Sequence, residues 1–194
     1  MGGTSTALIV LIVLVIAAAI LVFLVALIII YNKLVRLRNT AEQAWSDVEV
    51  QLQRRHDLIP NLVETVKGYM THERETLEAV TKARQMAVQV TGDVAKRAEA
   101  ENMLTQTLRS LFAVAENYPQ LKANENFLDL QQKLAEIEEQ IQLARRYYNA
   151  VVRDLNNAID MFPSNIVAKI FHFQHREYFE LTEPEAEEAP EVKF

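Results

Sequence analysis

The chain has 194 residues, a net charge of −6 and no cysteine. The absence of cysteine excludes disulfides, thiolate metal sites, a cysteine nucleophile and lipid attachment through cysteine. The hydrophobic fraction of 50% is raised by one N-terminal segment, and the other residues, about 160 of them, have an ordinary soluble composition that suits a single domain. The acidic balance does not favour a nucleic-acid-binding face.

The first feature along the chain is an uncharged apolar run from Ala7 to Tyr31. A helix of that length is about 37 Å long, whereas a hydrocarbon core is about 30 Å thick. We therefore predict a transmembrane helix at residues 7–31, preceded by a short extracytoplasmic N-terminus at residues 1–6. A cleaved signal peptide is disfavoured because no Lys or Arg precedes the run and because the run is about twice the usual length.

The charges beside the run predict its orientation. Lys33, Arg36 and Arg38 follow the run, and no charged side chain precedes it. The positive-inside rule then places the N-terminus outside and residues 33–194 in the cytoplasm.

Apolar residues continue after the membrane at the three- and four-residue spacing of a one-sided helix. Neither Gly nor Pro interrupts the chain between Gly3 and Pro60, so the membrane helix is predicted to continue into the following domain. We expect Pro60 to kink this helix rather than to begin a new one. The stripe comprises Leu34, Leu37, Ala41, Trp45, Val48, Leu52, Ile59, Leu62, Val66, Tyr69, Leu77 and Val80.

Two further helices are predicted. Thr91-Gly92-Asp93 indicates a helix stop followed by an N-cap, and Asn117-Tyr118-Pro119 ends the helix that follows. The next helix has a seven-residue repeat typical of a coiled-coil seam that Pro163 closes. The repeat comprises Phe127, Leu134, Ile141, Tyr148, Leu155 and Phe162, with Leu130, Ile137, Ala144, Val151 and Ala158 between them.

A last amphipathic segment spans Ile166 to Phe179, and an acidic, Pro-containing tail at 181–194 is predicted to be disordered. No strand pattern is present. The sequence therefore predicts an all-α fold, in which an elongated antiparallel bundle of three long helices and a short C-terminal helix occupies residues 32–180.

The chain lacks the patterns of a catalytic or metal site. No Glu lies three residues before any of the four histidines, which excludes the Glu-x-x-His pairs of a di-metal bundle. His172 and His175 are three residues apart but lack a third ligand. There is no Gly-rich phosphate loop and no nucleophile elbow. We expect a non-enzyme without cofactor or metal.

Two polar clusters stand out against the apolar stripes. They are either solvated helix flanks or a buried lock between the first and third long helices, in which the carbonyl of His56, freed by Pro60, is one acceptor. The sequence leaves both interpretations open. The clusters contain Arg54, Arg55, Asp57 and Asn61 in the first long helix, and Arg145, Asn149, Arg153 and Asn156 in the third.

Many strings of this chain resemble the LemA family of bacterial membrane proteins, with coverage from Tyr31 to Glu180. The acidic tail lies outside that resemblance. The longest strings are Tyr31-Asn32-Lys33-Leu34-Val35, Gln51-Leu52-Gln53-Arg54-Arg55-His56-Asp57-Leu58-Ile59-Pro60-Asn61-Leu62-Val63, Val66-Lys67-Gly68-Tyr69 and Ala115-Glu116-Asn117-Tyr118-Pro119-Gln120-Leu121-Lys122-Ala123, with Ala83-Arg84, Tyr148-Asn149, Phe162-Pro163 and Glu177-Tyr178-Phe179-Glu180 among the shorter ones.

This resemblance implies a single-span helical bundle on the bacterial inner membrane, and it says less about function. Relatives occur in systems that shape intracellular membranes, and members are often encoded beside membrane metalloproteases. These associations support a self-associating scaffold that organises or shapes the membrane, or alternatively an adaptor or regulator for a membrane protease or signalling complex.

Partners are expected to be the bilayer, further copies of the chain and a membrane protein such as a protease, but not nucleic acid. For self-association we expect an apolar stripe just after the membrane, made of Leu34, Leu37, Ala41 and Trp45, to contact neighbouring copies. The alternative is that Ile166 to Phe179 folds back and covers this stripe within one chain.

Overall fold

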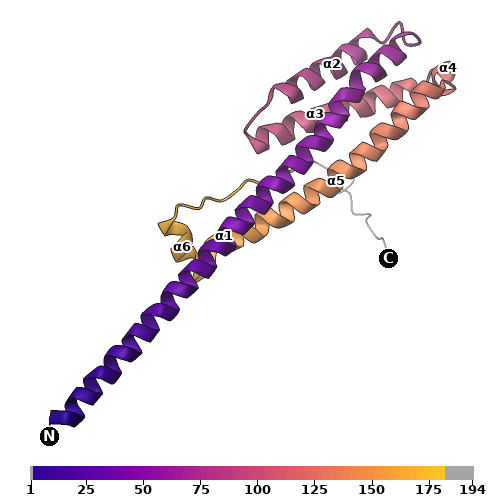
Figure 1. Cartoon of the computed structure of the whole chain (residues 1–194). Coiled ribbons are helices and arrows are strands. Elements are labelled where there is room, and N and C mark those ends of the chain that lie inside the picture. The colour runs from indigo at the N-terminus through magenta and orange to yellow at the C-terminus, as the bar shows by residue number, and fades with distance from the viewer. Residues whose placement is uncertain (1, 182–194) are drawn as a thin grey trace, which may run out of the picture. The chain divides into compact units, whose positions relative to one another are not determined.

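In the computed structural model the backbone is described for residues 2–181 and the side chains for residues 10–181. This part of the chain contains helices and no strand, which confirms the all-α prediction (Figure 1). The acidic tail from 182 onward lies outside the described residues. The helices are α1 (Gly2–Lys67), α2 (Arg74–Gln89), α3 (Val94–Ala115), α4 (Pro119–Lys122), α5 (Glu125–Asp160) and α6 (Ser164–Ile170).

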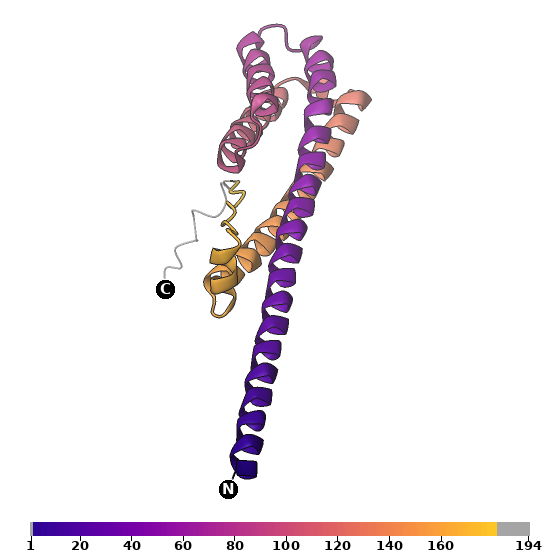
Figure 2. The ribbon, with the colours of Figure 1, turned by 60° about the vertical axis from the view of Figure 1, so that its left-hand side comes forward.

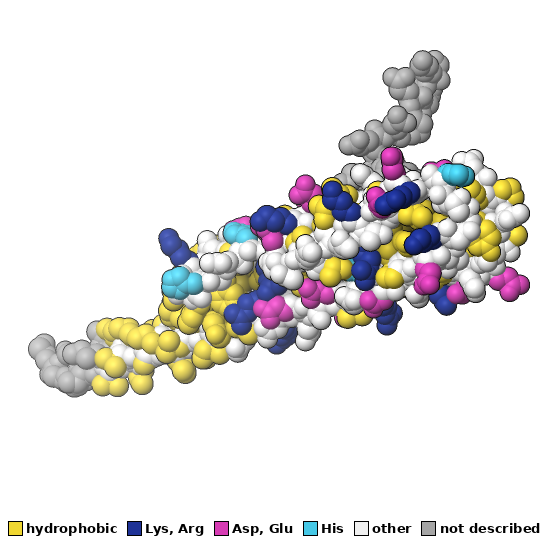
Figure 3. Space-filling view, turned by 90° about the horizontal axis from the view of Figure 1, so that it is seen from above, with side chains coloured by type: hydrophobic (Ala, Val, Ile, Leu, Met, Phe, Trp, Pro, Cys, Tyr) yellow, Lys and Arg dark blue, Asp and Glu magenta, His cyan; other side chains and the backbone are white. Residues whose placement is uncertain are grey.

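The apolar run forms the first part of α1 and is the one candidate membrane span among the described residues. Most large side chains from Val10 to Ile29 are 47–69% exposed, and Figure 3 shows hydrophobic side chains without charged ones along this stretch. Water would be an unfavourable surrounding for so large an apolar surface, whereas lipid would cover it. The helix therefore anchors the chain in a membrane.

The stripe prediction was wrong about where the first helix ends. α1 passes through Pro60 and ends at Lys67, and the amides of Tyr69 and Met70 both donate to the carbonyl of Val66. Leu77 and Val80, which were expected to continue the stripe, belong to α2. The three- and four-residue spacing of apolar side chains continues from α1 into α2, although residues 68–73 between the two helices are not helical.

Among the described residues, 44–149 and 177–181 form one compact unit, and 2–43 and 150–176 form another. In the larger unit α2 and α3 lie side by side (Figure 2). Asp93 caps α3 as predicted, since its carboxylate accepts a 2.9 Å bond from the amide of Lys96. The core of this unit is continuous over α1, α2, α3 and α5, and includes Ile59, Leu62, Val66, Val80, Leu104, Leu111, Phe127 and Leu134.

The seven-residue repeat of α5 is buried along most of its length. Phe127, Leu134, Ile141 and Tyr148 are at most 5% exposed. Phe162, predicted as the last member of the seam, is instead 78% exposed, because α5 ends at Asp160 and the chain turns there. The prediction for Phe162 was therefore wrong.

The last amphipathic segment is only partly helical. α6 ends at Ile170, and His172 adopts a φ of 56°. The amide of Phe173 donates to Ala168 O and that of His172 donates to Lys169 O, which is the Schellman arrangement for stopping a helix. Residues 173–181 then continue without helix, so the predicted helix to Phe179 was too long.

The proposed assembly stripe is buried within the chain. Leu34 and Ala41 are fully buried, Leu37 is half-buried, and Trp45 packs on Tyr148 and Phe179 with ring centroids 5.2 and 5.3 Å away. The expectation that neighbouring copies must cover this stripe was wrong, because side chains of the same chain supply the contacts. The alternative, in which the C-terminal segment folds back, accounts for Trp45.

Candidate functional site

A buried ionic cluster is the most unusual feature of the larger unit. Arg55 and His56 follow one another on α1 and are at most 1% exposed, and Glu101 on α3 is fully buried. Arg55 Nη2 pairs with Glu101 Oε2, and His56 Nε2 lies 3.0 Å from Glu101 Oε1. Two consecutive α1 side chains therefore meet one carboxylate of α3.

The cluster extends to α5 and to the start of α3. Arg55 Nη1 donates to Glu138 Oε2 at 2.8 Å and to Thr105 Oγ1 at 3.0 Å. Arg97, one turn before Glu101, lies 3.2 Å from the same carboxylate. Because Arg55 binds acceptors on both α3 and α5, it fixes the register of three helices. The cost of removing these charges from water offsets much of their mutual attraction.

Proline inside α1 creates a further polar contact. Pro60 has no N–H, so the carbonyl of His56, four residues earlier, lacks its helical donor. Arg84 of α2 fills this position, donating from Nε to the His56 oxygen at 2.7 Å. The proline therefore provides α2 with an acceptor on α1, and α1 continues as a helix through it.

Burial alone would raise the pKa of the Glu101 carboxyl. The hydrogen bond from His56 and the charge of Arg55 act in the opposite direction, and together they leave the pKa of Glu101 below its ordinary value. Glu101 is therefore ionised at neutral pH, and the positive charge of Arg55 beside it balances its negative charge. A carboxylate held in this way is a poor general acid or base at neutral pH, since its pKa is far from the working pH.

The residues predicted to form the lock have different environments: Arg55 lies in the buried ionic cluster, three residues of the second cluster bind the backbone after α6, and the others are exposed. Of the first cluster, Arg55 alone enters the buried network, whereas Arg54, Asp57 and Asn61 are exposed. Of the two open interpretations, the buried lock applies to Arg55, which reaches α5 through Glu138, although its partners are Glu101 and Glu138 and not the second cluster.

The second cluster instead holds the segment after α6. The Asn149 amide pairs with both backbone groups of Phe179, at 3.1 and 2.9 Å, and Arg145 Nη1 donates to Leu181 O. In the other unit, Asn156 pairs in the same double manner with the backbone of Arg176, whereas Arg153 is exposed. These asparagines replace the strand partner that an extended backbone otherwise needs.

Sequence reasoning missed Glu101, Glu138, Arg84, Arg97 and Thr105. Glu101 carried a signal, because it interrupts the apolar positions Ala98 and Leu104 of a predicted helix and a charge within an apolar stripe is seldom buried without a partner. The described residues contain no group of three or more His, Cys, Asp or Glu side chains that could hold a metal ion.

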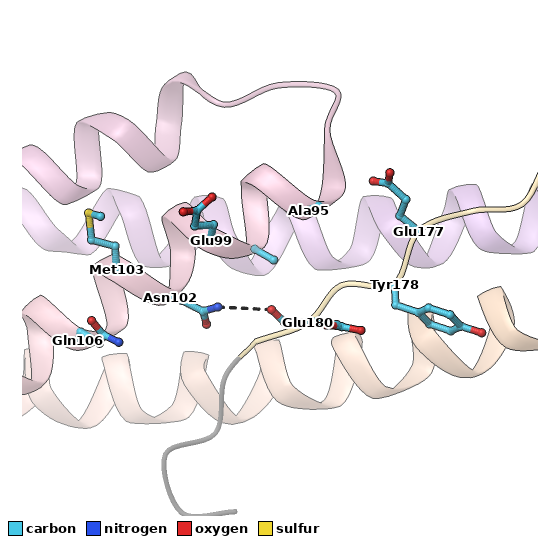
Figure 4. A pocket seen from close by; sticks show the side chains of 9 residues that line it. Ala95, Glu99, Asn102, Met103, Gln106, Glu177, Tyr178 and Glu180 are labelled. Carbon is cyan, nitrogen blue, oxygen red and sulfur yellow. Dashed lines mark hydrogen bonds between the residues drawn. The ribbon is translucent and has the colours of Figure 1, made fainter. Parts of the chain in front are cut away.

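Open grooves lie on the surface of the larger unit. One of about 710 Å³ lies between α3 and the C-terminal segment (Figure 4), where the Asn102 amide points to the Glu180 carbonyl. Two smaller ones, of about 340 and 230 Å³, share Arg109, Phe112 and Gln131 and follow α3 and α5. We call this pair the α3–α5 groove.

These features define an all-α, membrane-anchored protein whose buried charges neutralise one another. The family model for the LemA family matches residues 44–194. This chain belongs to the LemA family. The match includes the acidic tail, which the resemblance seen in the sequence left out.

Curated relatives share about a quarter of their residues with this chain. "Protein LemA" of Metamycoplasma hominis is 26% identical over 154 residues, which cover 79% of this chain and 70% of the relative. "Magnetosome protein MamQ 2" of Paramagnetospirillum magneticum is 26% identical over 183 residues, with coverage of 81% and 67%. "Magnetosome protein MamQ" of Magnetospirillum gryphiswaldense is 24% identical, with the same coverage.

Proposed function

We propose that this protein is a non-catalytic scaffold, anchored by α1 in the bacterial inner membrane, that acts by binding and organises the membrane that holds it. The observation that carries the proposal is that the buried charged side chains are paired with one another. Arg55, His56 and Glu101 are bound to one another across α1 and α3. Arg55 also lines the α3–α5 groove, but its guanidinium is held there by Glu101 and Glu138.

Its orientation follows from the flanking charges. Lys33, Arg36 and Arg38 are exposed at the end of the span, and the positive-inside rule assigns that end to the cytoplasm. The domain from residue 44 onward would then face the cytoplasm. Relatives named as magnetosome proteins support a role at a membrane.

Self-association is part of this proposal and depends on α1. Because Leu34 and Ala41 are already buried, copies would meet through the exposed residues of the span. Helices in lipid associate by van der Waals packing and interhelical hydrogen bonds. Light scattering on the full chain in a mild detergent tests this. We expect a mass of several copies, and a monomer at high concentration would contradict self-association.

The α3–α5 groove favours a second candidate, an adaptor that binds a helix of another membrane protein. Leu128 lines this groove and is 48% exposed. For an adaptor, Leu128→Glu should abolish a stoichiometric crosslinked complex in native membranes. Leu143→Glu is the matched control, because Leu143 is 45% exposed on the same helix and does not line the groove. Equal effects of the two substitutions would contradict the adaptor function.

A further inference from the structure

Large apolar side chains are exposed around the turn from α5 to α6. Phe162 is 78% exposed, more than any other large hydrophobic side chain in the described part of the chain. Four others nearby, Met161, Ile166, Ile170 and Phe171, are 51–64% exposed. We call these five residues the α6 patch. Val167 and Ala168 of the same helix are buried, and its exposed side carries Ile166 and Ile170 together with the polar residues Asn165 and Lys169.

The α6 patch lies beside the end of the membrane span. Within the same compact unit, the ring of Phe171 is 4.7 Å from that of Tyr31, the last residue of the apolar run, and Phe173 is 6.0 Å away from it. Figure 3 shows hydrophobic side chains continuing from the free stretch of α1 onto the surface next to it. The patch is therefore continuous with the surface that lipid covers.

The charges around the patch suit an anionic surface. Although the whole chain has a net charge of −6, the non-membrane parts of this unit, residues 31–43 and 150–176, carry more basic than acidic side chains. The basic residues are Lys33, Arg36, Arg38, Arg153, Lys169 and Arg176, and the acidic ones are Glu42, Asp154 and Asp160. Each of the three carboxylates lies beside a basic side chain: Glu42 beside Arg176, Asp154 beside Arg153 and Asp160 beside His175. Lys33, Arg36 and Lys169 are exposed.

We infer that residues 161–171 form a second membrane contact, in which the α6 patch enters the headgroup region of the bilayer beside α1 while Lys169 and the basic residues after the span face anionic headgroups. Short segments with aromatic and aliphatic side chains on one side and Lys or Arg nearby bind at this depth, about 5–10 Å into the boundary. Trp and Tyr are enriched at the same level in membrane proteins, and Tyr31 occupies this position at the end of the span.

This inference rests on α1 spanning a membrane and holds whether the protein is a scaffold or an adaptor. A second copy of the chain is the competing occupant of the patch. Lipid is favoured because Tyr31, the Phe171 ring and the exposed span form one continuous apolar surface. Because α1 already holds the unit at the bilayer, the patch needs no further partner to reach lipid.

The absence of cysteine allows a direct test in the full-length protein. Single-cysteine variants Phe162→Cys, Ile166→Cys and Asp154→Cys are labelled with a small fluorophore and placed in nanodiscs of phosphatidylethanolamine and phosphatidylglycerol. Acyl-chain-brominated lipids then quench labels that lie in the membrane boundary. Asp154 is the control because it is 62% exposed in the same unit and is charged. Ile20→Cys reports separately whether α1 is inserted.

We expect the labels at 162 and 166 to be quenched at least about twice as strongly as that at 154, because only they would lie within the bilayer boundary. Equal quenching at 162 and 154, with strong quenching at 20, would overturn the inference and leave the anchor intact. Weak quenching at 20 would show that α1 is not inserted in the bilayer, and it would refute the second contact as well, because that contact depends on the insertion of α1. Quenching at 162 that appears only in discs holding one copy, and is absent from discs holding several, would assign the patch to contact between copies.

Discussion

Arg55→Met should be among the most destabilising single substitutions in this chain. The side chain is 1% exposed, and its guanidinium binds Glu101, Glu138 and Thr105. Methionine fills a similar volume but leaves the fully buried carboxylate of Glu101 without its arginine. Removing one partner of a buried pair costs about 3–5 kcal/mol.

The structure places the expected loss near the lower end of this range. His56 and Arg97 remain 3.0 and 3.2 Å from Glu101, and Glu138 is 35% exposed, so water can solvate it again. We therefore expect a loss of about 3 kcal/mol. The double variant Arg55→Met with Glu101→Gln should lose less than the sum of the single losses, by at least about 1 kcal/mol, because neither partner is then left charged.

Unfolding of the full chain in nanodiscs by guanidinium can be followed through its single tryptophan. Trp45 packs on Tyr148 and Phe179, so its fluorescence reports the larger unit. Arg54→Met is the matched control, because Arg54 is the exposed neighbour and should cost less than about 0.5 kcal/mol. Equal losses for Arg54→Met and Arg55→Met would refute the buried network.

Four further predictions concern other parts of the structure. In Glu101→Gln, the loss of stability on acidification should be smaller. Because the fold lowers the pKa of Glu101, the ionised carboxylate contributes its full stabilising free energy above the ordinary pKa of 4.5 and loses it as the pH falls through the lower pKa of the folded state. Identical slopes in the acid unfolding curves of the two proteins would contradict this. Asn149→Ala leaves both backbone groups of Phe179 without partners and should cost about 1–3 kcal/mol, with faster proteolysis after residue 176; unchanged cleavage would mean that the segment is held in another way. Ile141→Ala should cost about 2–5 kcal/mol in chemical unfolding, and a loss typical of a surface site would place Ile141 outside the core. His172→Gly should raise the stability of the smaller unit by about 0.5–1 kcal/mol, because glycine adopts a φ of 56° without strain; a lower melting temperature would argue against the left-handed turn.

The repeat in α5 was predicted well because it depends on side-chain spacing alone. Phe127, Ile141 and Tyr148 are buried as the repeat requires. The same rule failed at Phe162, because spacing does not say where the backbone leaves the helix. Similarly, the spacing of Leu77 was compatible with a continuous α1, although the turn at 68–73 separates the two helices.

The choice between Arg54 and Arg55 was available from the sequence. Arg55 is three residues after Leu52 and four before Ile59, so it lies on the apolar stripe, whereas Arg54 points about 100° away from it. The partners were not available, because Glu101 and Glu138 are 46 and 83 residues distant along the chain. Helical periodicity predicts which face is buried but not which helix covers it.

The burial of Leu34 and Ala41 could not be predicted for a related reason. Their spacing predicts an apolar face, and a neighbouring copy or a returning segment of the same chain covers such a face equally well. The Schellman turn at His172 places Phe171 and Phe173 against Tyr31, and a histidine in a left-handed conformation has no sequence signature comparable to glycine.

Labelling with a membrane-impermeant maleimide tests the central claim most directly, namely that α1 holds a cytoplasmic helical domain at the inner membrane. Single cysteines at Thr4 and at Glu139, which is exposed on α5, are introduced into the otherwise cysteine-free chain. In intact spheroplasts we expect Thr4→Cys to be labelled and Glu139→Cys to be protected until the membrane is permeabilised. Labelling of Glu139→Cys in intact spheroplasts would contradict the account.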